Sequence, residues 1–486
     1  MVSFIVYDVI FLVLFTLAVV LFLYKRRHNL KRQGLLYLYR TSFGLKVIDW
    51  TAKKFERILR PLQYVVITSG YVLMVGIIWF TVKVVILYTR PDIIRAIKVP
   101  PIIPLFPYLP SVFKLDFLPP FYFTYWIIII AIIAISHEFA HGIFARLNNI
   151  KVHSTGFGFL GPFLAAFVEP DEKHMNKAKK FPQLSILAAG TFANVIMTIL
   201  FALILWIFFM TSFVPAGVNF NAYPNAVVNL NDIKSVSGNL IDNINDIPEF
   251  AKEEDELTEI VVILKEDPSR YQEETFFAPS EMKFLVPGDN LRQAVEKGIE
   301  NVVVFEDAPA IKAGLKGPIL AINGFPVVDQ NELREELIKY EPGEVIKITT
   351  IENEEKKEIE LELGEKDNKA YLGIKFNPYN RKGIIGFIFG IVTKVKNPLV
   401  YYEPIWGSNF AWFVYNLLWW IVLINLSVAL INMLPVGIFD GGRFFYLTVW
   451  GITRSEKFGR NLFALATWAI IVVLIWLMLQ WALAVF

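Results

Sequence analysis

The sequence contains no cysteine, which excludes disulfide bonds, thiolate nucleophiles and zinc sites built from cysteine. It is also poor in charge, because 19% of its 486 residues are charged whereas 55% are hydrophobic. Soluble proteins carry about 25% charged residues, so this composition predicts a membrane protein. The formal net charge of +2 does not indicate a nucleic-acid partner, and we expect none.

The first 24 residues lack the basic region and the small-residue cleavage site of a signal peptide, so we expect them to remain as a membrane-spanning helix. Six segments are long and apolar enough to span the bilayer: about 3–24, 64–88, 121–146, 181–211, 409–434 and 460–486. The expected fold is a polytopic α-helical membrane protein of the cell membrane.

Successive spans cross the membrane in opposite directions, so every second loop lies on the same side. The basic residues are concentrated in the loops of one side. They occur in "KRRHNLKRQ" after the first span, in Lys173, Lys177, Lys179 and Lys180, and in Arg443, Arg454, Lys457 and Arg460. The positive-inside rule then predicts that these loops are cytoplasmic. Both termini and the region 213–382 are expected on the outer side.

Two apolar stretches do not fit a regular helix. Residues 90–120 contain "VPPIIPLFPYLP", whose prolines predict a loop on the outer side. Residues 152–169 are interrupted by Gly156, Gly158, Gly161 and Pro162. We expect them to form a re-entrant β-hairpin that is shielded by the rest of the protein.

The third span carries an H-E-x-x-H pattern. His137 and His141 are four residues apart, so on a helix they share a face and can bind one metal ion. Glu138 points about 100° away from His137 and can accept a proton from water. The alternative is a pair of buried, hydrogen-bonded histidines, but that does not explain an acidic side chain at membrane depth.

Two histidines leave a catalytic zinc one protein ligand short. His153 and His174 are both expected on a cytoplasmic loop, so a carboxylate is the better candidate. Asp440 in "NMLPVGIFDGGRFF" follows Pro435, which ends a helix, and precedes two glycines that permit a sharp turn. The alternative role for Asp440 is a helix cap or a turn.

The chain resembles the site-2 proteases, which are zinc metalloproteases that cleave within the membrane. The resemblance is carried by "HEFAH" at 137–141, "AAGTFAN" at 188–194 and "NMLPVGIFDGG" at 432–442. Thr191 stands where the family usually has proline. The resemblance implies that His137, His141 and Asp440 hold Zn²⁺, that Glu138 is the catalytic base, and that the hairpin presents a β-edge to the substrate.

Asn194 and Asn432 come from two other helices of the same core. Either one can hydrogen-bond the substrate backbone or an oxyanion, or it can serve as a polar contact between helices.

The outer region contains a degenerate repeat. Its two copies align through Phe220 and Phe305, Pro224 and Pro309, Leu230 and Leu315, and Gly238 and Gly324. The second copy, with "DAPAIKAGLKGPILAINGFPV", resembles a PDZ domain of the bacterial protease type, and we expect an inserted α+β region of two PDZ-like modules. PDZ modules bind peptides at a sheet edge, although both copies can instead be rigid spacers.

These patterns divide the chain into five parts. They are two N-terminal spans (1–120), the first half of a catalytic core (121–212), two PDZ-like modules (213–300 and 301–382) and the second half of the core (383–486).

The predicted function is a zinc-dependent endopeptidase that cleaves transmembrane protein substrates, with the active site toward the cytoplasmic side. The PDZ pair would filter substrates that an upstream site-1-type protease has trimmed. The alternatives are a catalytically inactive, membrane-tethered PDZ scaffold and a metal transporter. No inverted pair of broken helices supports transport.

Overall fold

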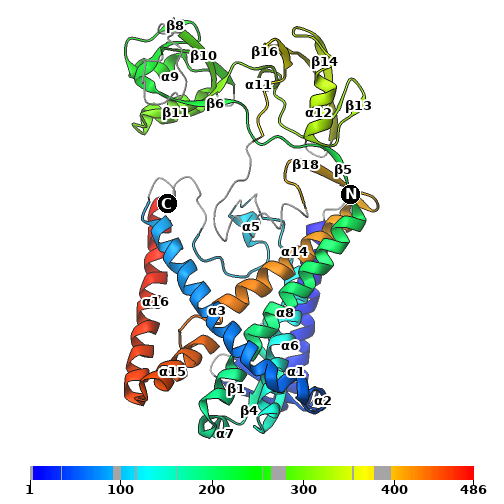
Figure 1. Cartoon of the computed structure of the whole chain (residues 1–486), viewed down its shortest axis with the longest axis vertical. Helices are drawn as coiled ribbons and strands as arrows, with labels where there is room; N and C mark the ends of the chain where they lie inside the picture. Colours follow the sequence, from blue (N-terminus) through cyan, green and yellow to red (C-terminus); the bar gives the residue numbers. More distant parts are fainter. Residues whose placement is uncertain are drawn as a thin grey trace. The chain divides into compact units, whose positions relative to one another are not determined.

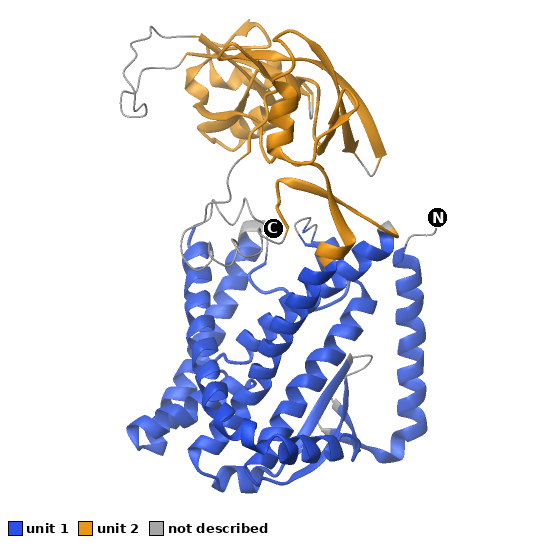
Figure 2. Cartoon of the chain, turned by 45° about the vertical axis from the view of Figure 1, so that its right-hand side comes forward, with its two compact units in different colours: residues 1–208, 409–486 blue, residues 209–408 orange. Residues whose placement is uncertain are grey.

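A computed structural model of the chain describes residues 4–33, 36–90, 100–113, 115, 118–160, 163–253, 256–263, 281–352, 355–376 and 396–485. The chain divides into two compact units (Figure 2). Unit 1 consists of Met1–Phe208 and Asn409–Phe486, and unit 2 consists of Phe209–Ser408. Two of the predicted hairpin residues, Gly161 and Pro162, lie outside the described residues, as do 91–99 of the proline-rich loop.

Among the residues that the structure describes, six helices are long and apolar enough to cross a membrane, in agreement with the six spans predicted. They are α1 (Phe4–Arg26), α3 (Glu56–Tyr88), α6 (Phe123–Leu147), α8 (Lys180–Ser212), α14 (Ser408–Ile431) and α16 (Glu456–Val485). A helix pairs all its interior backbone groups within one segment, which is the requirement for spanning lipid. The start of α1 and the end of α16 lie at the same end of unit 1 (Figure 1).

The opposite end of unit 1 carries a four-stranded antiparallel sheet in the order β1-β2-β3-β4. The strands are β1 (Leu30–Gln33), β2 (Leu36–Thr41), β3 (Val152–Leu160) and β4 (Phe163–Pro170). The predicted hairpin is present as the antiparallel pair β3 and β4, and that it re-enters the membrane stays a prediction. The sequence did not predict that the loop after α1 adds two strands to it, with Tyr39 opposite Phe157.

In the described part of unit 1, these elements are connected by the short helices α2 (Leu45–Lys54), α5 (Leu109–Val112), α7 (Glu172–Lys177) and α15 (Asp440–Thr453). α2 and α7 lie at the same end as the sheet (Figure 1). The main core of this end packs α3, α6, α8 and α15 around buried residues such as Met74, Ala188 and Phe444.

Helix α1 is attached to α6 by one buried carboxylate. Asp8 is 1% exposed and accepts hydrogen bonds from the backbone N–H groups of Phe123 and Thr124, at 2.7 and 2.9 Å. The hydroxyls of Tyr108 and Thr124 also donate to it. Asp8 thus caps the first turn of α6 from another helix, so the first span is an integral part of the bundle.

Unit 2 contains two six-stranded sheets. The first has the order β6-β11-β10-β9-β7-β8, and the second contains β15-β14-β12-β5-β18 with β13 paired to β12. The strands of the first sheet are β6 (Asn225–Asn229), β7 (Ile233–Val236), β8 (Asn239–Leu240), β9 (Leu257–Ile263), β10 (Glu281–Pro287) and β11 (Asn301–Glu306). Those of the second are β5 (Phe213–Val218), β12 (Ile319–Ile322), β13 (Phe325–Pro326), β14 (Val345–Glu352), β15 (Glu355–Glu362) and β18 (Val400–Pro404).

The remaining elements of unit 2 are short. They are α9 (Ile247–Phe250), α10 (Gly288–Glu296), α11 (Pro309–Lys312), α12 (Gln330–Leu337) and the strand pair β16 (Gly364–Lys366) and β17 (Lys369–Tyr371). Each sheet has its own apolar core. The predicted boundary at residue 300 does not separate the two sheets, because β11 pairs with β6 and β10 of the first sheet. That the two modules are PDZ-like stays a prediction.

Candidate metal centre

Helix α6 carries His137, Glu138 and His141 in its second half. The spacing of four residues places the two imidazole rings on one face of the helix, with ring centroids 4.7 Å apart. The Nε2 atoms of the two rings lie 3.1 Å from each other.

The chain folds back sharply after α14 to bring Asp440 to these histidines. Helix α14 ends at Ile431 and Asp440 is the first residue of α15, and the Gly441 N–H donates to the Asn432 carbonyl at 2.7 Å. A Cβ on Gly441 would lie 2.4 Å from the Met433 carbonyl carbon, so only glycine permits this approach. The chain does reverse before Asp440, but it does so at residues 432–439, and Gly441 and Gly442 lie in the first turn of α15 rather than in the turn predicted for them. α14 also ends before the predicted residue 434.

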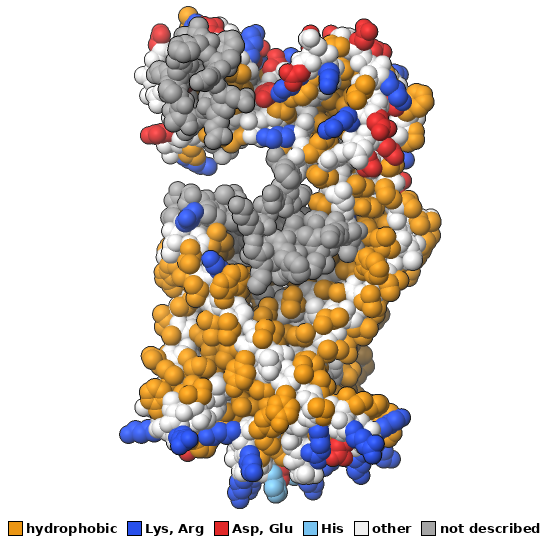
Figure 3. All heavy atoms as spheres, viewed as in Figure 1, with side chains coloured by type: hydrophobic (Ala, Val, Ile, Leu, Met, Phe, Trp, Pro, Cys, Tyr) orange, Lys and Arg blue, Asp and Glu red, His pale blue; other side chains and the backbone are white. Residues whose placement is uncertain are grey.

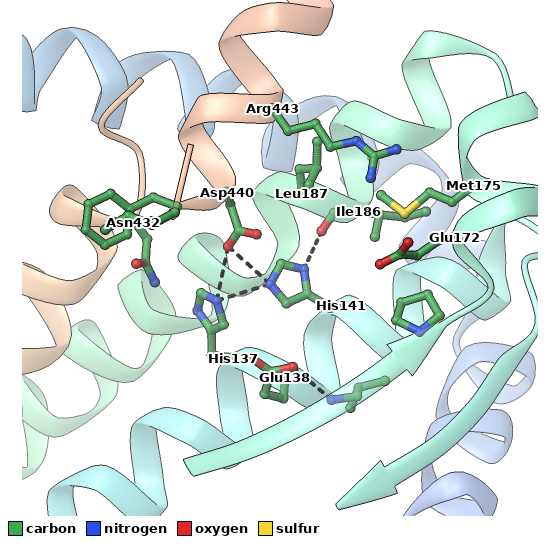
Figure 4. A pocket seen from close by; sticks show the side chains of 14 residues that line it. His137, Glu138, His141, Glu172, Met175, Ile186, Leu187, Asn432, Asp440 and Arg443 are labelled. Carbon is green, nitrogen blue, oxygen red and sulfur yellow. Dashed lines mark hydrogen bonds and ion pairs between the residues drawn. The ribbon is translucent and has the colours of Figure 1, made fainter. Parts of the chain in front are cut away.

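Asp440 completes a compact group of three potential metal ligands (Figure 4). Its Oδ2 atom lies 3.2 Å from His137 Nε2 and 3.3 Å from His141 Nε2. The side chains of His137 and His141 are 10% and 12% exposed, and that of Asp440 is 23% exposed. Two imidazole nitrogens and one carboxylate oxygen are a ligand set that metal ions accept.

Helix α8 closes the back of this group. A Cβ on Gly190 would lie 2.5 Å from His141 Nε2 and 2.6 Å from His137 Nε2, so a larger residue cannot occupy this position without displacing both rings. The Ile186 carbonyl accepts a hydrogen bond at 2.7 Å from His141 Nδ1, which leaves the Nε2 lone pair of that ring directed at the group.

Asn194 lies behind His137 and does not line the cavity. It is 0% exposed, and its Nδ2 atom is 3.2 Å from His137 Nδ1. Its Oδ1 atom is buried and has no hydrogen-bond partner in the part of the chain that the structure describes. Asn432, in contrast, is half-buried and lines the cavity.

Glu138 is on the side of α6 that faces β4. Its Oε2 atom accepts a hydrogen bond from the Val168 N–H at 2.9 Å. Val168 lies opposite Thr155 of β3 in the hairpin. Its N–H is on the other side of β4, away from β3, where it faces α6. The base candidate is therefore attached to the edge of the hairpin.

A cavity of about 390 Å³ adjoins the three ligands. It is lined by His137, Glu138, His141, Val168, Pro170, Glu172, Met175, Ile186, Leu187, Asn432, Ile438, Phe439, Asp440 and Arg443. Arg443 follows Asp440 by three residues on α15, a spacing that could have indicated its place on the same helix face. Burial lowers the pKa of the Arg443 guanidinium, and the Glu172 carboxylate opposes that shift.

The other two histidines considered as ligands lie elsewhere. His174 Nδ1 is 2.7 Å from Asp171, and His153 Nε2 is 3.5 Å from the same carboxylate. The hydrogen bond from His174 lowers the pKa of Asp171 to about 2. Asp171 also caps the start of α7 by accepting from the His174 N–H.

The chain was then compared with known proteins. The family model described as peptidase family M50 matches residues 125–477, which include His137, His141 and Asp440. An uncharacterized protein of Methanocaldococcus jannaschii is 31% identical in an alignment of 201 positions that covers 39% of this chain. That match spans about half of the relative's length, 48%. Because the family model matches well over half of the residues, the chain belongs to peptidase family M50.

Proposed function

We propose that this protein is a zinc-dependent intramembrane endopeptidase that hydrolyses peptide bonds within or near the transmembrane helices of its substrates. The observation that carries the proposal is the convergence of His137 and His141 from α6 with Asp440 from α15. Membership of a peptidase family and six spanning helices support it.

The three side chains suit a zinc ion. Ligands at about 2.0–2.1 Å from a tetrahedral zinc lie about 3.3–3.4 Å from one another. The three distances here are 3.1, 3.2 and 3.3 Å, so little movement is needed to accept an ion. A bound zinc ion would supply a Lewis acid that acidifies water and polarises the scissile carbonyl.

Glu138 acts as the general base. Its carboxylate belongs to the residue next to His137 and lines the same cavity, so it can take a proton from the attacking water and return it to the departing amine. The hydrogen bond from Val168 holds this carboxylate toward β4. Asn432 lines the cavity just beyond the end of α14 and donates a hydrogen bond to the substrate backbone or the oxyanion.

Asn194 is a positioning residue for His137. A histidine that binds metal through Nε2 must carry its proton on Nδ1 and donate it to an acceptor. Rotation of the Asn194 side chain about its Cβ–Cγ bond exchanges the amide nitrogen, now 3.2 Å from Nδ1, with the unpartnered oxygen. The oxygen then accepts from Nδ1–H and keeps Nε2 free for the ion.

The substrate pairs with the edge of β4. A peptide bond in a transmembrane helix must be unwound before hydrolysis, and an added β-strand replaces its lost hydrogen bonds. β3 is already paired with β2, so β4 is the strand of the hairpin whose outer edge no described strand occupies. Backbone groups alternate along a strand, so Leu164 and Ala166 turn their N–H and C=O to the same side as Val168. A strand added there runs directly toward Glu138.

The sheet end of unit 1, with its basic loops, faces the cytoplasm, and both termini and unit 2 lie outside. The position of the basic residues supports this orientation. The cavity beside α7 then gives water access from the cytoplasmic side. Unit 2 contains two PDZ-like modules that admit single-span substrates already trimmed by a site-1-type protease.

The test is zinc analysis of the purified chain combined with cleavage of a panel of membrane helices. We expect about one zinc per chain in the wild type and in Glu138→Gln, cleavage by the wild type alone, and loss of zinc in Asp440→Ala. Undiminished cleavage by Glu138→Gln would remove Glu138 as the base. Full zinc content in Asp440→Ala together with no cleavage by the wild type would favour the inactive scaffold.

A further inference from the structure

The segment that joins the first two spans forms a basic platform at one end of unit 1. It runs from the end of α1 to the start of α3, both of which are candidate spans, so it lies at a membrane surface. Residues 25–60 contain eleven Lys and Arg residues and two acidic residues, Asp49 and Glu56. Lys and Arg side chains gather at this end of unit 1 (Figure 3).

Both acidic residues already have a basic partner, Asp49 outside this segment and Glu56 within it. Asp49 pairs with Arg146 at 2.7 Å, and Glu56 pairs with Arg60 at 2.7 Å. The side chains of Lys46, Lys53 and Arg57 are exposed, and no carboxylate among the described residues pairs with them. The positive charges of Lys46 and Lys53 on α2 and of Arg57 on α3 are thus not balanced within the described part of the chain.

Exposed apolar side chains accompany this charge on α2 and beside it. Phe43 is 79% exposed, Val47 53%, Trp50 54% and Ile58 64%. The Lys54 ammonium lies 4.5 Å from the centre of the Trp50 ring. A short helix with lysines and an exposed tryptophan is typical of segments that lie in the interface of a membrane with anionic lipids.

The inner face of α2 packs on the metal-binding helix. The Ile48 side chain contacts Gly142, where a Cβ would come within 2.8 Å of it, and Asp49 pairs with Arg146. Phe139, which lies between the two ligand histidines in the sequence, contacts Gly44 at the start of α2. A ligand that fixes the position of α2 at its outer face would therefore also limit the movement of α6, which carries His137 and His141.

We propose that α2 is an interfacial helix that binds the headgroups of anionic phospholipids through Lys46, Lys53 and Lys54, together with Arg57 at the start of α3, and that Trp50 and Val47 contact the acyl chains. The charge of the patch selects an anionic lipid, and its apolar residues select a lipid over free phosphate. The proposal does not depend on the peptidase activity, because binding is measured directly.

The experiment measures phosphatidylglycerol bound to the full-length protein in neutral detergent by native mass spectrometry, with phosphatidylcholine as the reference lipid. Each basic residue near a membrane surface strengthens binding by about fivefold. We expect the variant Lys46→Gln/Lys53→Gln/Lys54→Gln/Arg57→Gln to bind phosphatidylglycerol at least tenfold more weakly. A control with equal loss of charge in unit 2, Lys297→Gln/Lys316→Gln/Lys369→Gln/Lys375→Gln, should bind like the wild type.

Three further measurements distinguish lipid binding from phosphate binding. Trp50→Ala should weaken phosphatidylglycerol binding, and glycerol 3-phosphate at the same concentration should not displace the lipid. Raising the salt concentration should release phosphatidylglycerol from the wild type. Equal binding by the α2 variant and the wild type, or equal binding of the two lipids by the wild type, would overturn the proposal. Displacement by glycerol 3-phosphate would likewise overturn it in favour of a phosphate site.

Discussion

Gly190 makes a quantitative prediction about the metal centre. In Gly190→Ala the new Cβ would lie 2.5 and 2.6 Å from the Nε2 atoms of His141 and His137, whereas real Cβ contacts essentially never fall below 3.0 Å. Each ring must therefore recede by about 0.4–0.5 Å, which exceeds the tolerance of about 0.2 Å on metal–ligand distances. Both histidines are affected at once.

We expect this single methyl group to lower zinc affinity by at least about 100-fold, or about 2.8 kcal/mol, because loss of one supporting hydrogen bond alone costs 10- to 100-fold. The assay is competition for zinc between the purified variant and a chelator of known affinity. Size-exclusion chromatography and thermal unfolding report whether the variant is folded.

Gly76→Ala is the matched control. Gly76 lies in the spanning helix α3, and a Cβ there would be 3.7 Å from Leu430, which is ordinary contact. This variant should keep wild-type zinc affinity and gain up to about 1 kcal/mol of stability, since alanine favours a helix over glycine. If Gly190→Ala binds zinc as tightly as Gly76→Ala does, the three ligands do not bind the ion in the arrangement described.

Three further predictions concern the surroundings of the site. Asn194→Ala should weaken zinc binding by about 10- to 100-fold in the same competition assay, and Asn194→Asp, which keeps an acceptor oxygen, should restore most of it; equal losses in both would argue against the tautomer role. Asp8→Ala should destabilise the chain by about 2 kcal/mol in thermal unfolding while zinc binding is retained, because two buried N–H groups of α6 lose their acceptor. Deletion of 213–382 should allow cleavage of substrates with large outer domains, and a complete loss of cleavage of short substrates with zinc still bound would refute the filter.

Much of the fold and of the candidate site could be predicted from local sequence patterns. The six spans follow from the length of apolar runs, and the shared face of His137 and His141 follows from the helical period. Asp440 was selected because a zinc site needs a third ligand and because proline and glycine surround it. The structure brings its carboxylate within 3.3 Å of both imidazoles.

Contacts between segments that are distant in the chain escaped prediction. β2 pairs with β3 although more than a hundred residues separate them, so the available edge of the hairpin is β4. Asp8 caps α6 from another span for the same kind of reason. The sequence also predicted a boundary before β11, which pairs instead with the first sheet.

By itself, the sequence determined the number of spans, the helical face that presents the two histidines, and the turn at which Asp440 stands, because each depends on periodicity or on backbone preferences of nearby residues. Only the tertiary structure decided that Gly190 and Ile186 close the back of the site, that Asn194 stands behind His137, and that α2 lies against α6. Those contacts depend on how whole helices pack, and the side chains of one segment do not specify which distant segment will cover them.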